Sequence, residues 1–364
     1  MFYYMPTKVY QEEACVQKHG KELAGLGHKA LIVTGRSSAA GNGSLKDVTD
    51  ALDAYGTAYC IFNKVEENPS IETIMEARDY GIAAHADYVI GIGGGSPLDA
   101  AKAIALMMEN ADSDETLLYE KVSARTLPVA EIPTTCGTGS EVTPYAILTI
   151  HGKRTKSSLP HRIYPSLALI DGKYLEKIPH HILSNTAVDA LGHMIESYCN
   201  SNATDYSRML CAYAMEVWAR SRDAVAGSRA VGKEDRENLM MAAAMAGMAI
   251  THTGTSLPHA LSYKITYEKG TPHGKAIGVF LASYLAHADE NDRLTILNRL
   301  GMKDIEELRD FVTHAVGTVE VEQAFLEEMV QALLQNTAKL KNCPYVVDET
   351  IIKQICTESC TVQE

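Results

Sequence analysis

The sequence predicts an α/β domain followed by an all-α helical domain. In the first half of the chain, short apolar runs rich in branched residues alternate with helical patterns, which is typical of a parallel sheet covered by helices. After Asp171 the strand signals stop, and the remaining segments are rich in the helix formers Ala, Met, Leu, Glu and Lys. We therefore place an α/β domain at residues 1–175 and a helical domain at residues 176–364, and expect the functional site in the cleft between them.

Each predicted strand is a short, mostly apolar run, bounded in most cases by Gly, Pro or Asp. The predicted strands are Ala30–Thr34, Tyr59–Phe62, Tyr88–Ile92, Leu127–Ile132 and Leu167–Ile170. Two predicted helices, Ile71–Tyr80 and Pro97–Met108, lie among them. The predicted helices of the second domain are Asn185–Ser197, Tyr206–Arg220, Glu234–Ile250, Asp304–Ala315 and Val321–Lys339.

The charge balance narrows the class of protein. With 33 basic and 46 acidic residues, the chain carries a net charge of -13, which argues against a protein that tracks nucleic-acid phosphates. No run of apolar residues is long enough to span a membrane, and the N-terminus lacks the basic flank and apolar core of a signal peptide. We expect a cytoplasmic protein that binds neither nucleic acid nor membrane.

Two polar loops follow predicted strands. The glycine-rich turn Gly91–Ser96 (GIGGGS) opens a helix, and its glycines would let a phosphate approach the backbone N–H groups of the helix N-terminus. Because Ser96 stands where the dinucleotide fingerprint has its last glycine, the turn alone is equally compatible with a plain strand-to-helix connection. The second loop, Pro133–Glu141 (PTTCGTGSE), offers hydroxyl and backbone donors, although capping loops have a similar composition. Two such loops at strand ends indicate a Rossmann-like, dinucleotide-binding domain.

A third loop bears on the choice of dinucleotide. It follows the first predicted strand and begins with Gly35, Arg36, Ser37 and Ser38. An acidic residue at this position binds the ribose 2′-hydroxyl of NAD, whereas Arg and Ser accommodate the 2′-phosphate of NADP. The loop has no acidic residue, which favours NADP(H) over NAD(H); the alternative is a surface loop with an incidental arginine.

The helical domain carries a possible metal-ligand set. Asp189 and His193 are four residues apart in a helical pattern, so both project from one helix face; a surface ion pair has the same spacing. His259 and His273 each follow a proline directly, and a histidine in such a place is, taken alone, more often a core or capping residue than a ligand. One carboxylate and three imidazoles together suit a divalent transition metal, and Fe²⁺ and Zn²⁺ both fit such a set.

The motifs resemble those of the iron-containing (group III) alcohol dehydrogenase family. The glycine-rich turn with Asp99 and Lys102 is similar to its GGGSxxDxAK signature, and PTTCGTGSEVT at 133–143 is similar to its TTxGTGSE loop. The run from Asp189 to Glu196 resembles its helical signature, and the two later histidines have the family's spacing. The resemblance spans most of the chain.

The resemblance implies roles for particular residues. The implied metal ligands, which carry the catalysis, are Asp189, His193, His259 and His273. The implied cofactor-site residues, besides the third loop, are Asn68, Gly94, Gly95, Ser96, Asp99, Thr134, Thr135, Thr138 and Lys156. Many members have a histidine four residues after the third ligand; here Tyr263 stands there, which argues against a histidine-based proton relay. We expect the proton to leave through the Tyr263 hydroxyl, the ribose hydroxyls or solvent.

The activity implied is hydride transfer between a nicotinamide and a small alcohol or aldehyde in an active site between the two domains, with the metal as Lewis acid. The resemblance also implies a homodimer or a larger homo-oligomer. A related polyol dehydrogenase, a dehydroquinate-synthase-like lyase and a scaffold without catalysis stay open as alternatives. A lyase of that kind needs many basic residues for its substrate, and few lie near the predicted ligands.

Overall fold

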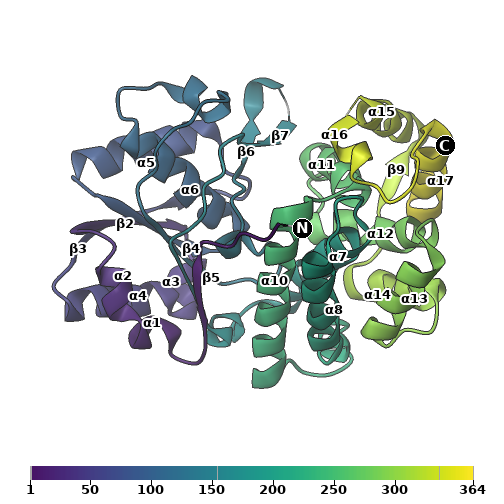
Figure 1. Cartoon of the computed structure of the whole chain (residues 1–364), viewed down its shortest axis with the longest axis horizontal. Helices are drawn as coiled ribbons and strands as arrows, with labels where there is room; N and C mark the ends of the chain where they lie inside the picture. The colour runs from purple at the N-terminus through teal and green to yellow at the C-terminus, as the bar shows by residue number, and fades with distance from the viewer. Residues whose placement is uncertain (1, 154, 336, 364) are drawn as a thin grey trace. The chain divides into compact units, whose positions relative to one another are not determined.

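The computed structural model describes residues 2–153, 155–335 and 337–363, and its contacts divide the chain into two compact units. The α/β unit is Tyr4–Ile178. The helical unit runs from Pro179 to the C-terminus and also includes Tyr3, whose ring stacks on His252 with the ring centroids 4.7 Å apart. In Figure 1 the α/β unit is coloured purple to teal and the helical unit teal to yellow.

The α/β unit is built on a six-stranded sheet in the order β1-β8-β5-β4-β2-β3, and every pair of neighbouring strands is parallel. Its strands are β1 (Lys8–Gln11), β2 (Lys29–Gly35), β3 (Ala58–Val65), β4 (Tyr88–Gly93), β5 (Val129–Pro133) and β8 (Leu167–Ile170). Successive side chains of a strand enter opposite faces of the sheet. On β4, Tyr88, Ile90 and Ile92 therefore belong to one buried core and Val89 to the other.

Helices cover both faces of this sheet. Those of the α/β unit are α1 (Cys15–Lys18), α2 (Gly20–Ala24), α3 (Ser38–Asn42), α4 (Ser44–Ala54), α5 (Ile71–Ala83) and α6 (Gly95–Glu109). Residues of α1, α2 and α4 contribute to one core, and residues of α5 and α6 contribute to the other. The predicted doubly covered parallel sheet is confirmed, with each of the five predicted strands present.

The sequence prediction missed three strands of the α/β unit. The edge strand β1 has the sequence KVYQ, in which polar residues flank only two apolar ones, so it lacks the longer apolar run of a central strand. The other two form an antiparallel pair, β6 (Ile147–Ile150) with β7 (Thr155–Ser158).

In its described residues after Pro179, the helical unit contains eleven helices, of which α9 (Arg222–Val225) is the shortest. The others are α7 (His180–Cys199), α8 (Asp205–Ala219), α10 (Lys233–Thr253), α11 (Leu257–Lys269), α12 (His273–Ala286), α13 (Glu290–Leu300), α14 (Ile305–Val316), α15 (Gln323–Leu334), α16 (Thr337–Lys341) and α17 (Glu349–Ser359). None of the helices in the described ranges has both the length and the apolar character of a membrane span.

Two details of the helical unit differ from the prediction. It is not entirely helical, because β9 (Glu320–Glu322) pairs in parallel with β10 (Thr361–Gln363). The single helix predicted over Val321–Lys339 is also wrong: its first residues lie in β9, α15 ends at Leu334, and α16 begins at Thr337. Three-residue strands with exposed Glu side chains carry too little pattern to be read against a helical background.

Candidate active site

The three predicted cofactor loops lie at one edge of the sheet. β2 and β4 are neighbours, with Thr34 paired to Ile92, and β4 and β5 are neighbours, with Gly93 paired to Pro133. The chain moves from β2 to β3 on one side and then returns to β4 on the other side, so β2 and β4 flank the point where the strand order reverses. Dinucleotides bind at this point in doubly wound sheets.

The two loops after β4 and β5 are in close contact. A Cβ atom on Gly94 would lie 3.2 Å from Cγ2 of Thr135, and a Cβ atom on Gly95 would lie only 2.7 Å from Cγ2 of Thr138. Gly95 therefore has no room for a side chain. Thr134 joins the same region, because its N–H donates to the Gly93 carbonyl at 2.8 Å.

A second group gathers Asn68, Ser96 and Lys156. The Asn68 N–H donates to Ser96 Oγ at 3.0 Å, and Lys156 Nζ donates to Asn68 Oδ1 at 2.5 Å. Asn68 adopts the left-handed conformation with φ 60°, which is uncommon for a residue with a side chain. Burial lowers the pKa of Lys156 to about 8. Residues up to 88 positions apart in sequence thus form one polar group near the start of α6.

Asp99 and Lys102 lock the second loop onto α6. Lys102 is fully buried and donates to Ser140 Oγ at 2.7 Å, to the Ser140 carbonyl at 2.6 Å and to the Tyr145 carbonyl at 2.9 Å. Asp99 accepts from Ser140 Oγ at 2.6 Å and from the Ile147 N–H at 2.9 Å. Both carboxylate oxygens of Asp99 are therefore engaged by the protein itself.

The third loop is open to solvent. Gly35 ends β2 and is half-buried, whereas Arg36, Ser37 and Ser38 are exposed at the start of α3. A Cβ atom on Gly35 would meet nothing closer than the Val65 carbonyl at 3.5 Å.

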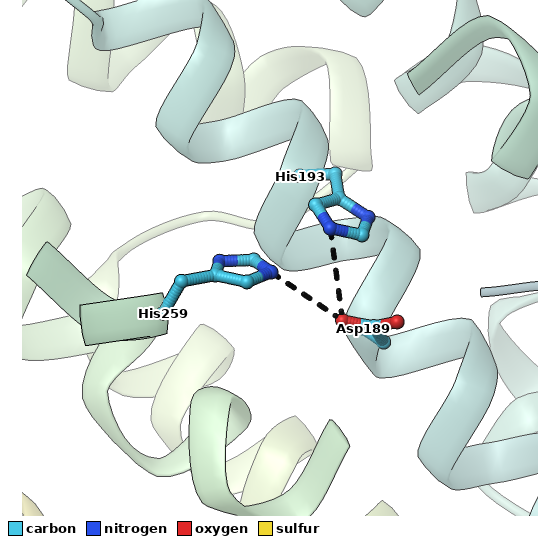
Figure 2. A group of neighbouring side chains, drawn as sticks. All are labelled: Asp189, His193 and His259. Atoms are coloured by element: carbon cyan, nitrogen blue, oxygen red, sulfur yellow. Dashed lines mark ion pairs between the residues drawn. The ribbon is translucent and has the colours of Figure 1, made fainter. Parts of the chain in front are cut away.

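In the helical unit, three of the four predicted ligands come together. One ligand atom from each of Asp189, His193 and His259 lies within 4.8 Å of the others, and all three residues are buried (Figure 2). Asp189 Oδ1 is 3.5 Å from His259 Nε2 and 3.9 Å from His193 Nε2. Among the described residues, neither Asp189 Oδ1 nor His259 Nε2 has a hydrogen-bond partner. Buried polar atoms are normally paired, so these two fit a shared metal ion.

The fourth predicted ligand borders this group. The ring of His273 meets that of His259 edge-on, with the ring centroids 5.6 Å apart. The ring of Tyr263 in turn stacks on that of His273, with the ring centroids 6.1 Å apart. Gly274 permits the approach of α12 to α7, because a Cβ atom there would lie 1.7 Å from the Asn185 carbonyl. Asn185 Oδ1 also accepts the Lys275 N–H at 3.0 Å and so caps the helix that begins at His273.

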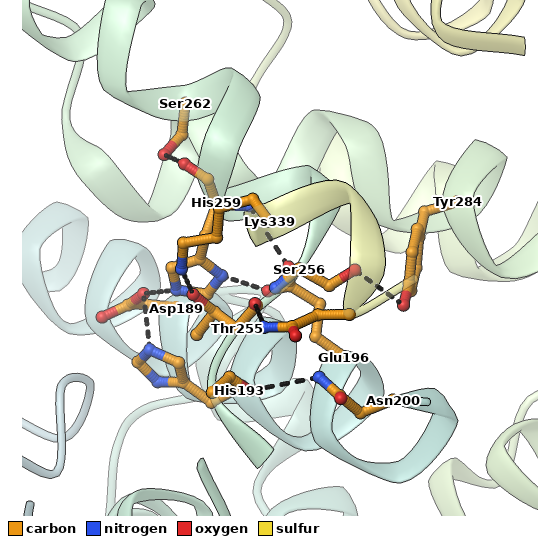
Figure 3. A network of polar contacts seen from close by, with 12 residues as sticks. Asp189, His193, Glu196, Asn200, Thr255, Ser256, His259, Ser262, Tyr284 and Lys339 are labelled. Carbon is orange, nitrogen blue, oxygen red and sulfur yellow. Dashed lines mark hydrogen bonds and ion pairs between the residues drawn. The ribbon is translucent and has the colours of Figure 1, made fainter. Parts of the chain in front are cut away.

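Glu196 is a site residue to which the sequence analysis gave no role. It is fully buried, and its Oε2 accepts the Nδ1–H of His259, while its Oε1 accepts the N–H of Ser256 at 2.9 Å (Figure 3). A hydrogen bond from Nδ1 fixes the tautomer of His259 and leaves Nε2 as the ligand atom. Its helical spacing from Asp189 and His193 is a signal that could have found it.

Opposite charges dominate the electrostatics of this group. Burial alone would raise the pKa of Asp189, but the three histidines outweigh it and hold the pKa of Asp189 below its usual range. Burial alone would lower the pKa of His259, yet Glu196 and Asp189 raise it to about 9. The geometry therefore favours cations at this position, either a proton or a metal ion.

Comparison with known proteins identifies the family. The model of the iron-containing alcohol dehydrogenase family matches residues 6–172, and that of the family's C-terminal domain matches residues 183–342. The chain is 34% identical to lactaldehyde reductase of Escherichia coli (strain K12), with 79% of this chain and 77% of that protein covered. It is 29% identical to NADPH-dependent butanol dehydrogenase of Clostridium saccharobutylicum, with 77% and 72% covered. The solved iron-containing alcohol dehydrogenase of Thermotoga maritima is 36% identical, with 97% and 98% covered and a TM-score of 0.89.

A Rossmann-like unit joined to a helical unit with a buried Asp-His-His group defines a metal-dependent oxidoreductase. The chain belongs to the iron-containing alcohol dehydrogenase family. It is an NAD(P)-linked alcohol dehydrogenase, or aldehyde reductase, as the resemblance implied. The family implies iron and a nicotinamide cofactor.

Proposed function

We propose that this enzyme reduces small aldehydes with NADPH, using Fe²⁺ held by Asp189, His193, His259 and His273. The observation that carries the proposal is the buried group in which Asp189 Oδ1 and His259 Nε2 face each other without a hydrogen-bond partner among the described residues. Zn²⁺ suits the same ligand set.

Each proposed ligand contributes differently to binding the ion. Asp189 supplies negative charge, His193 and His259 supply neutral imidazole nitrogens, and Glu196 keeps His259 in the tautomer that presents Nε2. His273 completes the set from the start of α12. A divalent ion bound there withdraws electron density from a carbonyl oxygen and so favours hydride addition to the carbonyl carbon.

The two loops after β4 and β5 hold the cofactor in this proposal. The N–H groups at the start of α6, beside Gly94, Gly95 and Ser96, would receive the pyrophosphate, and Thr135 and Thr138 would line the ribose and nicotinamide. Lys156 and Asn68 add a cation and an amide to the same group. Asp99 would support cofactor binding without touching the cofactor, because its carboxylate holds the second loop in place.

The preference for NADP(H) rests on the exposed third loop. Arg36 offers a guanidinium and Ser37 and Ser38 offer hydroxyls at the end of β2, where a 2′-phosphate needs donors. Replacing Gly35 by Asp would place a carboxylate near that phosphate and should shift the preference toward NADH. The Clostridium saccharobutylicum relative is named for its use of NADPH, which agrees with this assignment.

Tyr263 is the proton-transfer residue in this proposal. It lies one turn after His259 on α11, and its ring stacks on His273. The hydroxyl of Tyr263 would pass a proton between the substrate oxygen and water. We further propose that the enzyme is cytoplasmic and forms a homodimer or larger homo-oligomer. Sedimentation of the purified enzyme would test the oligomeric state.

Metal analysis of variants tests the proposal. Wild type and H252A, whose histidine stacks on Tyr3 outside the ligand group, should each hold one metal ion per chain. H259A and D189A should lose it, because each removes a buried ligand. Stoichiometric metal in H259A or D189A would contradict the proposed site.

A further inference from the structure

The segment Lys339–Cys343 joins two of the three chain segments that carry the predicted ligands, the third being α12 with His273. Asp189, His193 and Glu196 lie on α7, whereas His259 lies on α11, which follows the loop Gly254–Ser256. The end of α7 and this loop are about 50 residues apart in sequence, and each meets Lys339–Cys343 through several contacts.

Asn342 contacts both the loop Gly254–Ser256 and the residues just beyond the end of α7. Its Nδ2 donates to the Thr255 carbonyl at 2.9 Å, on the loop before α11. Its Oδ1 accepts from Asn202 Nδ2 at 3.1 Å, and its carbonyl accepts the Ser201 N–H at 3.1 Å, both just beyond the end of α7. One residue thus makes three hydrogen bonds that connect the two ligand-bearing segments.

Neighbouring contacts strengthen the same connection. Lys339 Nζ, on a residue labelled in Figure 3, donates to Thr255 Oγ1. Cys343 Sγ lies 3.1 Å from Ser256 Oγ. The N–H of Ser256 is the one that donates to Glu196, so the loop held by this segment also orients the carboxylate behind His259. Gly254 adopts φ 72° and leaves room for Asn342, whose Nδ2 would lie 3.1 Å from a Cβ atom there.

We propose that Asn342 is a positioning residue for the metal site, which sets the distance between His259 and the ligands on α7 without touching the ion. The inference rests on the proposed metal site. The physical reason is that the hydrogen bonds of Asn342 add to those that already join the end of α7 to this loop, from Asn200 Nδ2 to the Gly254 carbonyl at 3.3 Å and from the Ser256 N–H to Glu196 Oε1 at 2.9 Å. Metal affinity depends on how firmly the segments that carry the ligands are held.

Titration of the metal-free chain with Co²⁺, in competition with a chelator, tests the inference. N342A should raise the Co²⁺ dissociation constant about 10-fold and alter the visible spectrum of the bound Co²⁺, because the ligand geometry loosens. N202A, which removes only the partner beyond α7, should change both in the same direction by less. If N342A does not fold, N202A alone decides between the outcomes.

Two controls separate positioning from a general loss of stability. K341A leaves the Lys341 carbonyl that accepts from Ser201 Oγ and should bind Co²⁺ like wild type. V330A removes methyl groups from the buried side of α15, so it should lower the unfolding midpoint yet leave the Co²⁺ constant unchanged. Two results would overturn this inference and leave the proposed function intact. One is Co²⁺ binding as tight as wild type in both N342A and N202A, and the other is Co²⁺ binding weakened as much in V330A as in N342A. Absence of Co²⁺ binding in wild type would overturn the proposed function as well.

Discussion

At the scale of single residues, the metal site depends on which atoms are left without protein partners. Glu196 takes the Nδ1–H of His259, so the only nitrogen left to bind an ion is Nε2, which faces Asp189. The proximity of Asp189 and His193 could be predicted from the sequence, because helical spacing places them on one face. The pairing of Glu196 with His259 could not, because it joins residues 63 apart whose contact depends on tertiary packing.

Substituting Glu196 by Gln should weaken metal binding by about 10- to 100-fold, because a neutral amide neither attracts the imidazole N–H as strongly nor fixes its tautomer as firmly. The dissociation rate of the bound metal, followed after addition of excess chelator, measures the effect. E328Q is the matched control, because Glu328 pairs with Lys264 at an exposed position. An E196Q enzyme that keeps its metal as tightly as E328Q would show that the contact has no part in binding.

Lys156 should make cofactor binding depend on pH. Burial lowers the pKa of its ammonium group to about 8, so the group is charged below that pH and neutral above it. An anionic cofactor favours the charged form, and its affinity should therefore fall as the pH rises through 8. NADPH fluorescence titrations on either side of pH 8 would show this fall in wild type but not in K156Q. The same pH dependence in K156Q would assign the titration to another group.

At the scale of elements, the helix α6 and the loop after β5 are joined by buried and half-buried hydrogen bonds. The sequence pattern located both, because a glycine-rich turn before a helix and a Thr-Gly-Ser loop after a strand are local signals. It did not reveal that Lys102 and Asp99 clamp Ser140, since those contacts span 38 and 41 residues. Glu131 adds a buried carboxyl 3.9 Å from Lys102, and burial raises the pKa of Glu131 well above its usual range.

The free energy of unfolding of K102M should be about 3 kcal/mol below that of wild type, because the half-buried Asp99 carboxylate would lose its cation and the Ser140 and Tyr145 carbonyls would lose a donor. It should also raise the KM for the cofactor, because the loop with Thr135 and Thr138 loosens. Denaturant unfolding and cofactor kinetics measure the two effects. K46M, which removes an exposed lysine paired with Asp50, should change stability by less than about 0.5 kcal/mol. Equal stability of K102M and K46M would rule out the clamp.

At the scale of the whole molecule, central strands were easier to predict than marginal ones. β4 and β5 are buried along their whole length, so β4 reads as a continuous apolar run and β5 as one that Glu131 alone interrupts. β1 lies at the sheet edge and has only two apolar residues between polar ones, and β9 and β10 are three residues long within a helical unit. Sequence periodicity reports burial, and these short or marginal strands bury too little to leave a pattern.

The most direct test of the central claim is to strip the purified enzyme with a chelator and restore Fe²⁺ or Zn²⁺ anaerobically in separate samples. NADPH and NADH oxidation would then be followed with a panel of short aldehydes. We predict no turnover in the stripped enzyme, recovery with restored metal, and faster oxidation of NADPH than of NADH. Full turnover in the stripped enzyme, or none in any restored sample that holds both metal and nucleotide, would contradict the assignment of a metal-dependent aldehyde reductase.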